Sequence, residues 1–248
     1  MQLVYGCNNI FVQRNIYYKL LPMNTHILAF GPHPDDVEVW AWWTIAQASE
    51  KWFHNVIIDC TPSQLSTNWS PETRQVEAAK AAEYMGVKTR ENLGREDTKI
   101  QDDEHHRTII AQKIRQYKPK IVLVPSLNDR HPDHEIVPVI VKNWIFLAWL
   151  DKVSIKNKKW EELAPHRPKM LFQYMIRDFF ESDIIVGLSQ ENFRKKMQAF
   201  WAYWSQLKTN EHAMWFIHWR AQTLWFKIKK HYGEWFKTLG WSIWVDCF

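Results

Sequence analysis

The stretch THILAFGPHPDD, residues 25–36, decides both the fold and the chemistry expected of this chain. Its first half, 25–30, is a short apolar run ended by a Gly-Pro pair, which is typical of a buried β-strand. Its second half places His33, Asp35 and Asp36 directly after that strand. Side chains able to bind metal or transfer protons therefore follow the end of the first predicted strand.

A second polar cluster follows another apolar run. Residues 121–125 (IVLVP) predict a further buried strand, and the sequence DRHPDH occupies 129–134, just beyond it. Parallel strands end at one edge of their sheet, where open α/β sheets bind their ligands. If the two strands are neighbours, the two clusters share one pocket.

Apolar runs and helical segments alternate along the first 150 residues. Continuous Val/Ile-rich strands separated by helices predict an α/β fold: a Rossmann-like, mainly parallel sheet with helices on both faces. Besides the two strands above, we predict strands at 55–60 and 87–93, and helices at 44–51, 70–85, 103–117 and 135–150.

The pattern weakens beyond residue 151. We predict strands at 169–175 and 183–186 and a helix at 190–203, whereas the remaining aromatic and basic residues allow no firm assignment. We expect a single domain over 23–248. We expect residues 1–22 to be an N-terminal extension, either the product of a misplaced start codon or a disordered arm.

Composition excludes several classes of protein. The chain of 248 residues is 46% hydrophobic and 24% charged, which is ordinary for a soluble globular protein. It has no apolar run of roughly 18 residues that would predict a membrane span, and no convincing signal peptide, so we expect a cytoplasmic location. Its three cysteines are far apart and form no C-x-x-C pair, which excludes a cysteine-based zinc site.

The net charge of +5 permits an anionic partner, but the basic residues are spread widely along the chain. We therefore expect no nucleic acid among the partners. The rival hypothesis from a different class is a nucleic-acid-binding module that uses the basic, Trp-rich C-terminal third. Its aromatic side chains would stack on bases, and its binding would depend strongly on salt.

The two clusters contain the groups of a hydrolytic metal site. Two imidazoles and one carboxylate hold Zn²⁺ in many catalytic sites and leave one position open to water. The metal activates that water, while further side chains move protons. We predict His33, Asp36 and His134 as metal ligands, Asp35 as general base, His131 as acid or oxyanion stabiliser, and Asp133 as the residue that orients His131. The same ligand set suits Fe²⁺, and an Fe²⁺ oxygenase would require O₂.

The motif pair, His-Pro-Asp-Asp at 33–36 and Arg-His-Pro-Asp-His at 130–134, resembles the PIG-L/LmbE family of zinc-dependent N-acetylglucosaminyl deacetylases. The resemblance is strong over about 25–151 and includes the segments 44–46, 90–93 and 119–125. Weaker similarity between 165 and 207 is closest to the branch that deacetylates N-acetylglucosaminyl-malate in bacillithiol biosynthesis.

The resemblance implies an LmbE-like fold and hydrolysis of the N-acetyl group of an N-acetylglucosamine conjugate by a metal-bound water. It implies the same ligands and the same roles for Asp35 and His131. Arg74 matches an arginine that contacts substrate in relatives, with a surface charge as the alternative. Arg130 would meet a malate or phosphate anion, or would brace its loop. Another N-acetyl sugar or a glycolipid precursor stays open as substrate, and so does a homo-oligomer.

Tryptophan is unusually frequent and glycine unusually rare, with 16 Trp and 7 Gly. Glycine is thus about 3% of residues against a usual ~7%. The sequence WAWWTI at 40–45 stands where the family has Gly-x-Gly-Gly-Thr-Ile, and glycine serves where a backbone needs positive φ or close approach. We hypothesise that UGA codons meaning Gly were translated as Trp, and UGG codons at Trp42 and Trp43 would contradict this. The affected positions would be Trp40, Trp42, Trp43, Trp52, Trp69, Trp149, Trp225 and Trp235.

Overall fold

The computed structural model describes residues 3–5, 25–66, 69–176, 181–207, 211–222 and 232–239. The strands of these residues form one sheet in the order β1-β7-β8-β6-β5-β2-β3-β4. Their bounds are β1 (Leu3–Tyr5), β2 (Ile27–Gly31), β3 (Asn55–Asp59), β4 (Thr89–Asn92), β5 (Ile121–Pro125), β6 (Met170–Tyr174), β7 (Ile184–Leu188) and β8 (Tyr232–Thr238).

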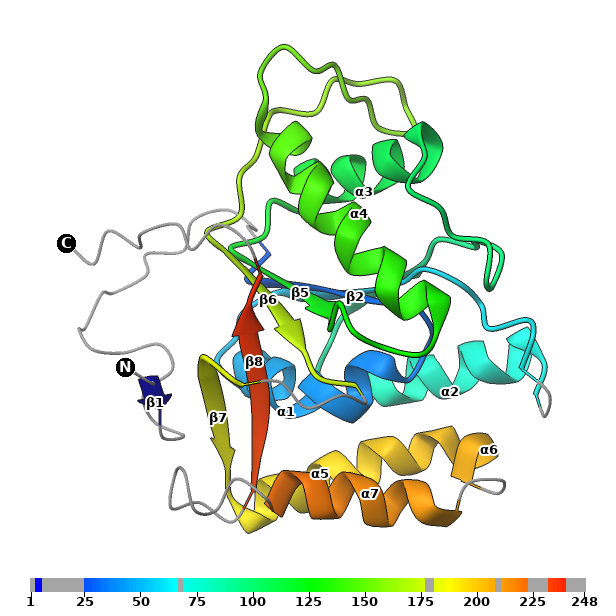
Figure 1. Ribbon diagram of the computed structural model, residues 1–248, viewed down its shortest axis with the longest axis vertical. Coiled ribbons are helices and arrows are strands. Elements are labelled where there is room, and N and C mark those ends of the chain that lie inside the picture. Colours follow the sequence, from blue (N-terminus) through cyan, green and yellow to red (C-terminus); the bar gives the residue numbers. More distant parts are fainter. Residues whose placement is uncertain are drawn as a thin grey trace.

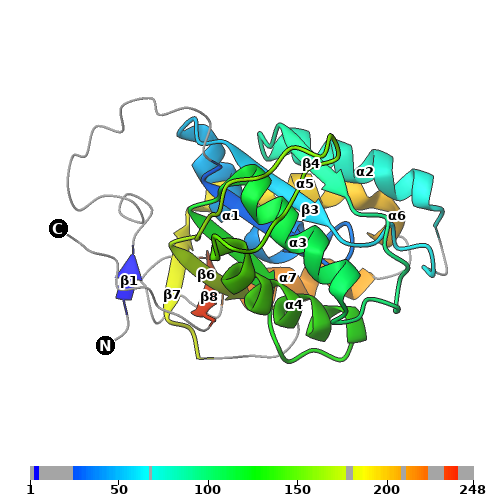
Figure 2. The same ribbon diagram turned by 90° about the horizontal axis from the view of Figure 1, so that it is seen from above.

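Helices cover both faces of this sheet, as Figures 1 and 2 show. The helices α3 and α4 lie on one face, and α1 and α2 lie on the other with α5, α6 and α7 beyond them. The expected α/β fold with a mainly parallel sheet is therefore confirmed. The helices are α1 (Asp36–Glu50), α2 (Pro71–Tyr84), α3 (Glu104–Tyr117), α4 (Pro132–Trp149), α5 (Gln190–Phe200), the 3₁₀ turn η1 (Trp201–Tyr203), α6 (Trp204–Leu207) and α7 (Glu211–Gln222).

The central strand β2 pairs in parallel with β5 on one side and β3 on the other, with Ile27 opposite Ile121 and Asn55. All five residues of each of these three strands are buried, because helices pack on both faces. The two strands that precede the polar clusters, β2 and β5, are therefore neighbours, which the shared pocket required.

Several boundaries differ from the sequence prediction. The first helix begins at Asp36 instead of residue 44. The sequence did not predict its first turns, because they are buried almost all round and show no amphipathic pattern. Helix α4 begins at Pro132 instead of 135. Strand β8, in the segment left unassigned, runs antiparallel to both of its neighbours, β6 and β7.

Residues 3–5 of the predicted N-terminal extension form β1, which pairs in parallel with the edge strand β7. The rest of the extension lies outside the described residues, and the division into extension and domain stays a prediction. None of the described helices is long and apolar enough to cross a membrane. The cytoplasmic location stays a prediction as well.

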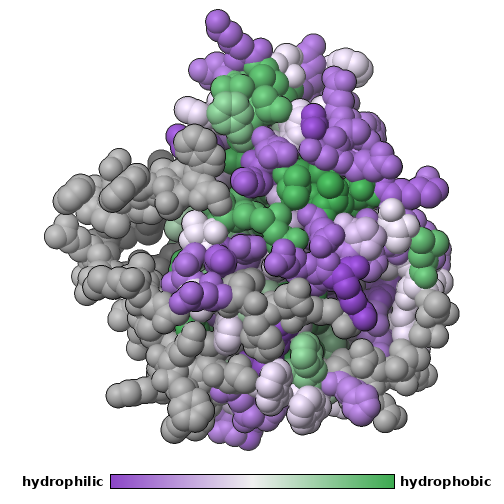
Figure 3. Space-filling model, viewed as in Figure 1, coloured by the Kyte–Doolittle hydropathy of each residue, from purple (hydrophilic) through white to green (hydrophobic). Residues whose placement is uncertain are grey.

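An apolar pocket between α4 and β6 lies away from the sheet edge that carries the polar clusters. Phe146, Trp149, Met170 and Leu239 are among its walls, and apolar side chains gather over part of α4 on the face shown in Figure 3. Because Met170 begins β6, the pocket is at the amino end of the parallel strands, whereas ligands of such sheets bind at the carboxyl ends.

Two tryptophans have backbone conformations that favour glycine. Trp52, directly after α1, has φ 63°, and Trp160 has the same φ. The Trp52 N–H donates to the Ser49 carbonyl and the Phe53 N–H to the Ala48 carbonyl, which is the hydrogen-bond pattern of a helix ended by a left-handed glycine.

Two further tryptophans leave polar atoms without partners. Trp42 and Trp43 are 1% and 2% exposed, and neither indole nitrogen forms a hydrogen bond among the described residues. A buried donor without a partner costs about 1–3 kcal/mol. Residues 40–45 form part of α1 and not a glycine-rich turn. The hypothesis that glycine codons were translated as Trp is therefore supported by the two unpaired indole N–H groups and by the positive φ of Trp52. It stays a prediction that the codons of the gene would test.

We expect Trp52→Gly to stabilise the protein by about 1 kcal/mol, because glycine relieves the strain of positive φ at an exposed site. Thermal or urea unfolding measures the change. Trp201→Gly is the matched control: Trp201 is also exposed but has φ −62°, so that glycine there destabilises. A lower melting temperature for Trp52→Gly would contradict the glycine interpretation of this position.

Candidate metal centre

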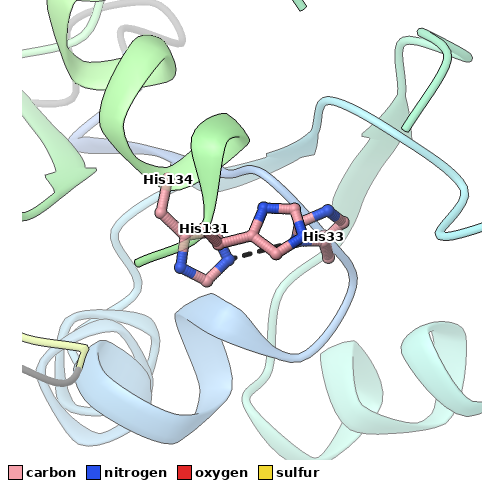
Figure 4. Close-up of side chains that lie close together, drawn as sticks. All are labelled: His33, His131 and His134. Carbon is pink, nitrogen blue, oxygen red and sulfur yellow. Dashed lines mark hydrogen bonds between the residues drawn. The ribbon is translucent and has the colours of Figure 1, made fainter. Parts of the chain in front are cut away.

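Three predicted ligands meet where β2 and β5 end. His33 follows β2, Asp36 begins α1, and His134 lies in the first turn of α4, after β5. The His33 Nδ1 atom is 3.1 Å from His134 Nε2 and 3.4 Å from Asp36 Oδ2, and the last two atoms are 3.3 Å apart. Figure 4 shows the two imidazoles directed toward one another. Three donor atoms at nearly equal spacing thus face one point.

Two carboxylates to which the sequence assigned no role lie close to the far nitrogens of these imidazoles. His33 Nε2 is 3.0 Å from Asp97 Oδ1, and His134 Nδ1 is 3.2 Å from Asp129 Oδ1. Such carboxylates fix the orientation of metal-binding histidines. Asp129 stands in the quoted second cluster and could have been found there, whereas Asp97 lies in the loop after β4, far from either motif.

Asp35 has an unusual conformation immediately before α1. Its φ of 123° is in the region that side chains rarely adopt, and such strain clusters at functional sites. Arg74 Nη1 holds the residue in place by donating to Asp35 Oδ2 at 2.9 Å and to the Pro34 carbonyl at 3.0 Å. Burial raises the pKa of the Asp35 carboxyl, and Arg74 opposes that shift.

Arg74 itself is only 3% exposed, so it is neither a surface charge nor an open, unpaired cation. The structure places it against Asp35. Arg130 is exposed near the end of the loop that leads from β5 into α4. A substrate contact by either arginine stays a prediction.

His131 lies beside both ligand histidines and caps the N-terminus of α4. Its Nδ1 accepts the backbone N–H of Asp133 at 3.3 Å, which leaves the proton of the neutral ring on Nε2. Burial, together with the charges of His33 and His134, lowers the pKa of His131. The ring is therefore neutral and has a hydrogen to donate.

The carboxylate of Asp133 does not contact His131 as expected. Its Oδ2 accepts the N–H of Thr98 at 2.8 Å and lies 3.4 Å from His33 Nε2. The helix start is the physical reason, because it turns the Asp133 amide toward His131 and its side chain toward the loop after β4. Asp133 thus contacts His131 through the backbone alone.

A buried ion network joins the first turn of α1 to β3 and β4. Arg90 on β4 pairs with Glu38 and with both oxygens of Asp59. Tyr203 reaches in from η1 and donates to Glu38 at 2.7 Å. Sequence reasoning missed Arg90 and Tyr203, since neither is close to a motif along the chain.

Comparison with known proteins matches residues 28–145 to the family model PIG-L, described as GlcNAc-PI de-N-acetylase. Among solved structures, the conserved protein TT1542 from Thermus thermophilus is 28% identical, with a TM-score of 0.79 over 86% of this chain and 94% of that one. An N,N′-diacetylchitobiose deacetylase from Pyrococcus horikoshii is 21% identical, with a TM-score of 0.78 over 87% and 84% of the two chains.

A 4-carboxy-2-hydroxymuconate hydratase from Pseudomonas putida is also similar, at 17% identity and a TM-score of 0.70 over 87% of this chain and 96% of that one. The deacetylase and the hydratase thus share the fold while their names differ in chemistry, so the likeness to each shows the fold alone. The family match is more specific, because residues 28–145 contain every predicted ligand and catalytic residue. Residues 28–145 of this chain are therefore similar to the PIG-L family model, a match that covers slightly less than half of the chain.

Proposed function

We propose that this protein is a metal-dependent hydrolase that removes the acetyl group from an N-acetylated sugar. The observation that carries the proposal is the convergence of His33 Nδ1, His134 Nε2 and Asp36 Oδ2 within 3.1–3.4 Å of one another. A general base and a proton donor, Asp35 and His131, adjoin that point from separate elements.

The donor set fits zinc. Zinc–ligand distances of about 2.0–2.1 Å in a tetrahedral site place the donor atoms roughly 3.3 Å apart. His33, Asp36 and His134 would hold the ion, which when bound supplies an activated water and polarises the substrate carbonyl. Fe²⁺ suits the same donors, so metal analysis of the purified protein decides between them.

Asp35 would take the proton of the attacking water. Its side chain is 20% exposed, so a bound substrate or water could reach it while Arg74 fixes one of its oxygens. Burial raises its pKa, which makes it a stronger proton acceptor than an exposed aspartate.

His131 would act at the opposite side of the substrate carbonyl. Because its Nδ1 accepts a backbone N–H, the Nε2–H of the neutral ring would donate a hydrogen bond that stabilises the oxyanion. The leaving amine would receive the proton that Asp35 takes from the water, either directly or after His131 has taken it up, because a neutral imidazole is too weak an acid to give up its own N–H. Asp133 would then contribute the backbone amide that fixes the ring.

The family match and the name of the Pyrococcus relative support an N-acetylglucosamine conjugate as substrate. The resemblance adds N-acetylglucosaminyl-malate, and with it bacillithiol biosynthesis, as the more specific candidate. Acetate release from a panel of N-acetylglucosamine conjugates tests the proposal. Salt-sensitive binding to nucleic acid without any acetate release would favour the rival hypothesis.

Asp35→Asn should lower kcat for acetate release by about 10²–10⁴-fold, because the amide cannot accept a proton. Asparagine tolerates positive φ, so the backbone is kept. Metal content, measured by elemental analysis, should stay near that of the unaltered protein. Full activity in this variant would refute the base assignment.

Metal binding should release protons at neutral pH. Burial lowers the pKa of His134, but Asp36 and Asp129 outweigh it and raise that pKa to about 9, and three aspartates raise the pKa of His33 as well. These raised pKa values favour protonated imidazoles at neutral pH when no metal is bound. Their protonation stabilises the metal-free fold below the ordinary pKa of 6.5 and is lost as the pH rises through about 9.

The apparent zinc affinity should accordingly rise between pH 7 and about 9, by up to tenfold per pH unit for each proton displaced. Titration calorimetry in buffers of different ionisation enthalpy counts these protons. An affinity that does not change over this range would show that the imidazoles are already neutral.

A further inference from the structure

A cleft opens beside Asp35. It has a volume of about 420 Å³, lies between α2 and β4, and is bounded by Pro34 and Arg74 at the end nearest the metal centre. Arg74 donates to the Pro34 carbonyl and to Asp35, so this end of the cleft adjoins the reacting centre. The part of a substrate that is not hydrolysed has room here.

The two guanidinium groups in the cleft wall are already neutralised. Arg90 donates to both oxygens of Asp59, at 2.7 and 2.8 Å, and also pairs with Glu38. Arg74 donates to Asp35 at 2.9 Å. Two cations thus face three carboxylates, and an entering anion would meet no uncompensated positive charge from either arginine.

Two further carboxylates line the cleft. Glu91 is paired with Lys113. Glu72, in the first turn of α2, is exposed and forms no ion pair among the described residues. A hydrogen bond with Ser70 lowers the pKa of Glu72, so the carboxylate is charged at neutral pH. The walls of the cleft therefore carry a net negative charge.

Uncharged hydrogen-bonding groups complete the walls. Gln75 is exposed on α2, and its side chain forms no hydrogen bond among the described residues. Asn92 uses Nδ2 on the Thr61 carbonyl and Oδ1 on the Gly94 amide, which leaves its second N–H and second lone pair. Amides and carboxylates both bind hydroxyl groups.

We infer that this cleft selects an uncharged, hydroxyl-bearing group, such as a second sugar ring, over an anionic group such as a carboxylate or phosphate. The inference rests on the proposed function and narrows its substrate class. It departs from the malate conjugate, whose carboxylates would enter negative surroundings. Arg130 is the rival anion site, since it does not line the cleft.

The test compares kcat/KM for acetate release by the metal-loaded full chain. N,N′-Diacetylchitobiose is the neutral substrate, and N-acetylglucosamine 6-phosphate and N-acetylglucosaminyl-malate are the anionic ones. The unaltered protein should prefer the neutral substrate by about tenfold or more, and added salt should weaken that preference.

Charge reversal locates the origin of the preference. Glu72→Lys should reduce the neutral-to-anionic ratio about fivefold, and Glu72→Gln should reduce it less. Glu83→Lys is the matched control, because Glu83 is exposed on the same helix but lies outside the cleft. Its ratio should equal that of the unaltered protein, and melting temperatures verify that all variants fold.

A preference of the unaltered protein for anionic substrates would overturn the inference, as would equal shifts in Glu72→Lys and Glu83→Lys. Loss of activity on anionic substrates alone in Arg130→Gln would assign the discriminating group to Arg130 instead. Absence of acetate release from every substrate would refute the proposed function. Binding of chitobiose and glucosamine 6-phosphate to the unaltered protein then tests the cleft alone, with tighter binding of the neutral sugar expected.

Discussion

Parallel pairing of β2 with β5 is the contact on which the rest of the structure depends. It sets Ile27 opposite Ile121, so both strands end at one edge of the sheet. His33 and His134 are 101 residues apart in the chain, yet their nitrogens come within 3.1 Å. A slip of two residues between these strands would displace one imidazole by roughly 6–7 Å, too far for a shared ion.

Buried negative charge is the second constraint. Asp36, Asp97, Asp129 and Asp133 all surround the two imidazoles and are nearly inaccessible to solvent. Buried carboxylates require a compensating cation, and these aspartates raise the pKa values of both histidines, which favours a positively charged imidazole beside them. A divalent ion held by His33, Asp36 and His134 would meet the same need.

The residues that directly follow β2 and β5 could be recognised from the local sequence alone. The parallel sheet, and the proximity of His33, Asp36 and His134, could be predicted from apolar runs and the polar residues after them. Asp97, Arg90 and Tyr203 were beyond reach, because each acts through contacts between segments distant in the chain. The start of α1 was missed for a different reason: a helix buried on nearly all sides has no period-3.6 stripe to detect.

The C-terminal part of the chain contacts β2 and α1, the two elements that flank the loop with His33, through a few polar interactions. Tyr203 bonds Glu38, the Tyr174 hydroxyl bonds the Phe30 carbonyl, and Glu234 on β8 accepts the amides of Trp43 and Thr44. The family-matching segment is consequently not a portable module. A chain that ends at residue 145 would keep His33, Asp36 and His134 but lose the hydrogen bonds from Tyr203, Tyr174 and Glu234. Truncated or grafted versions of this protein therefore need the full sheet.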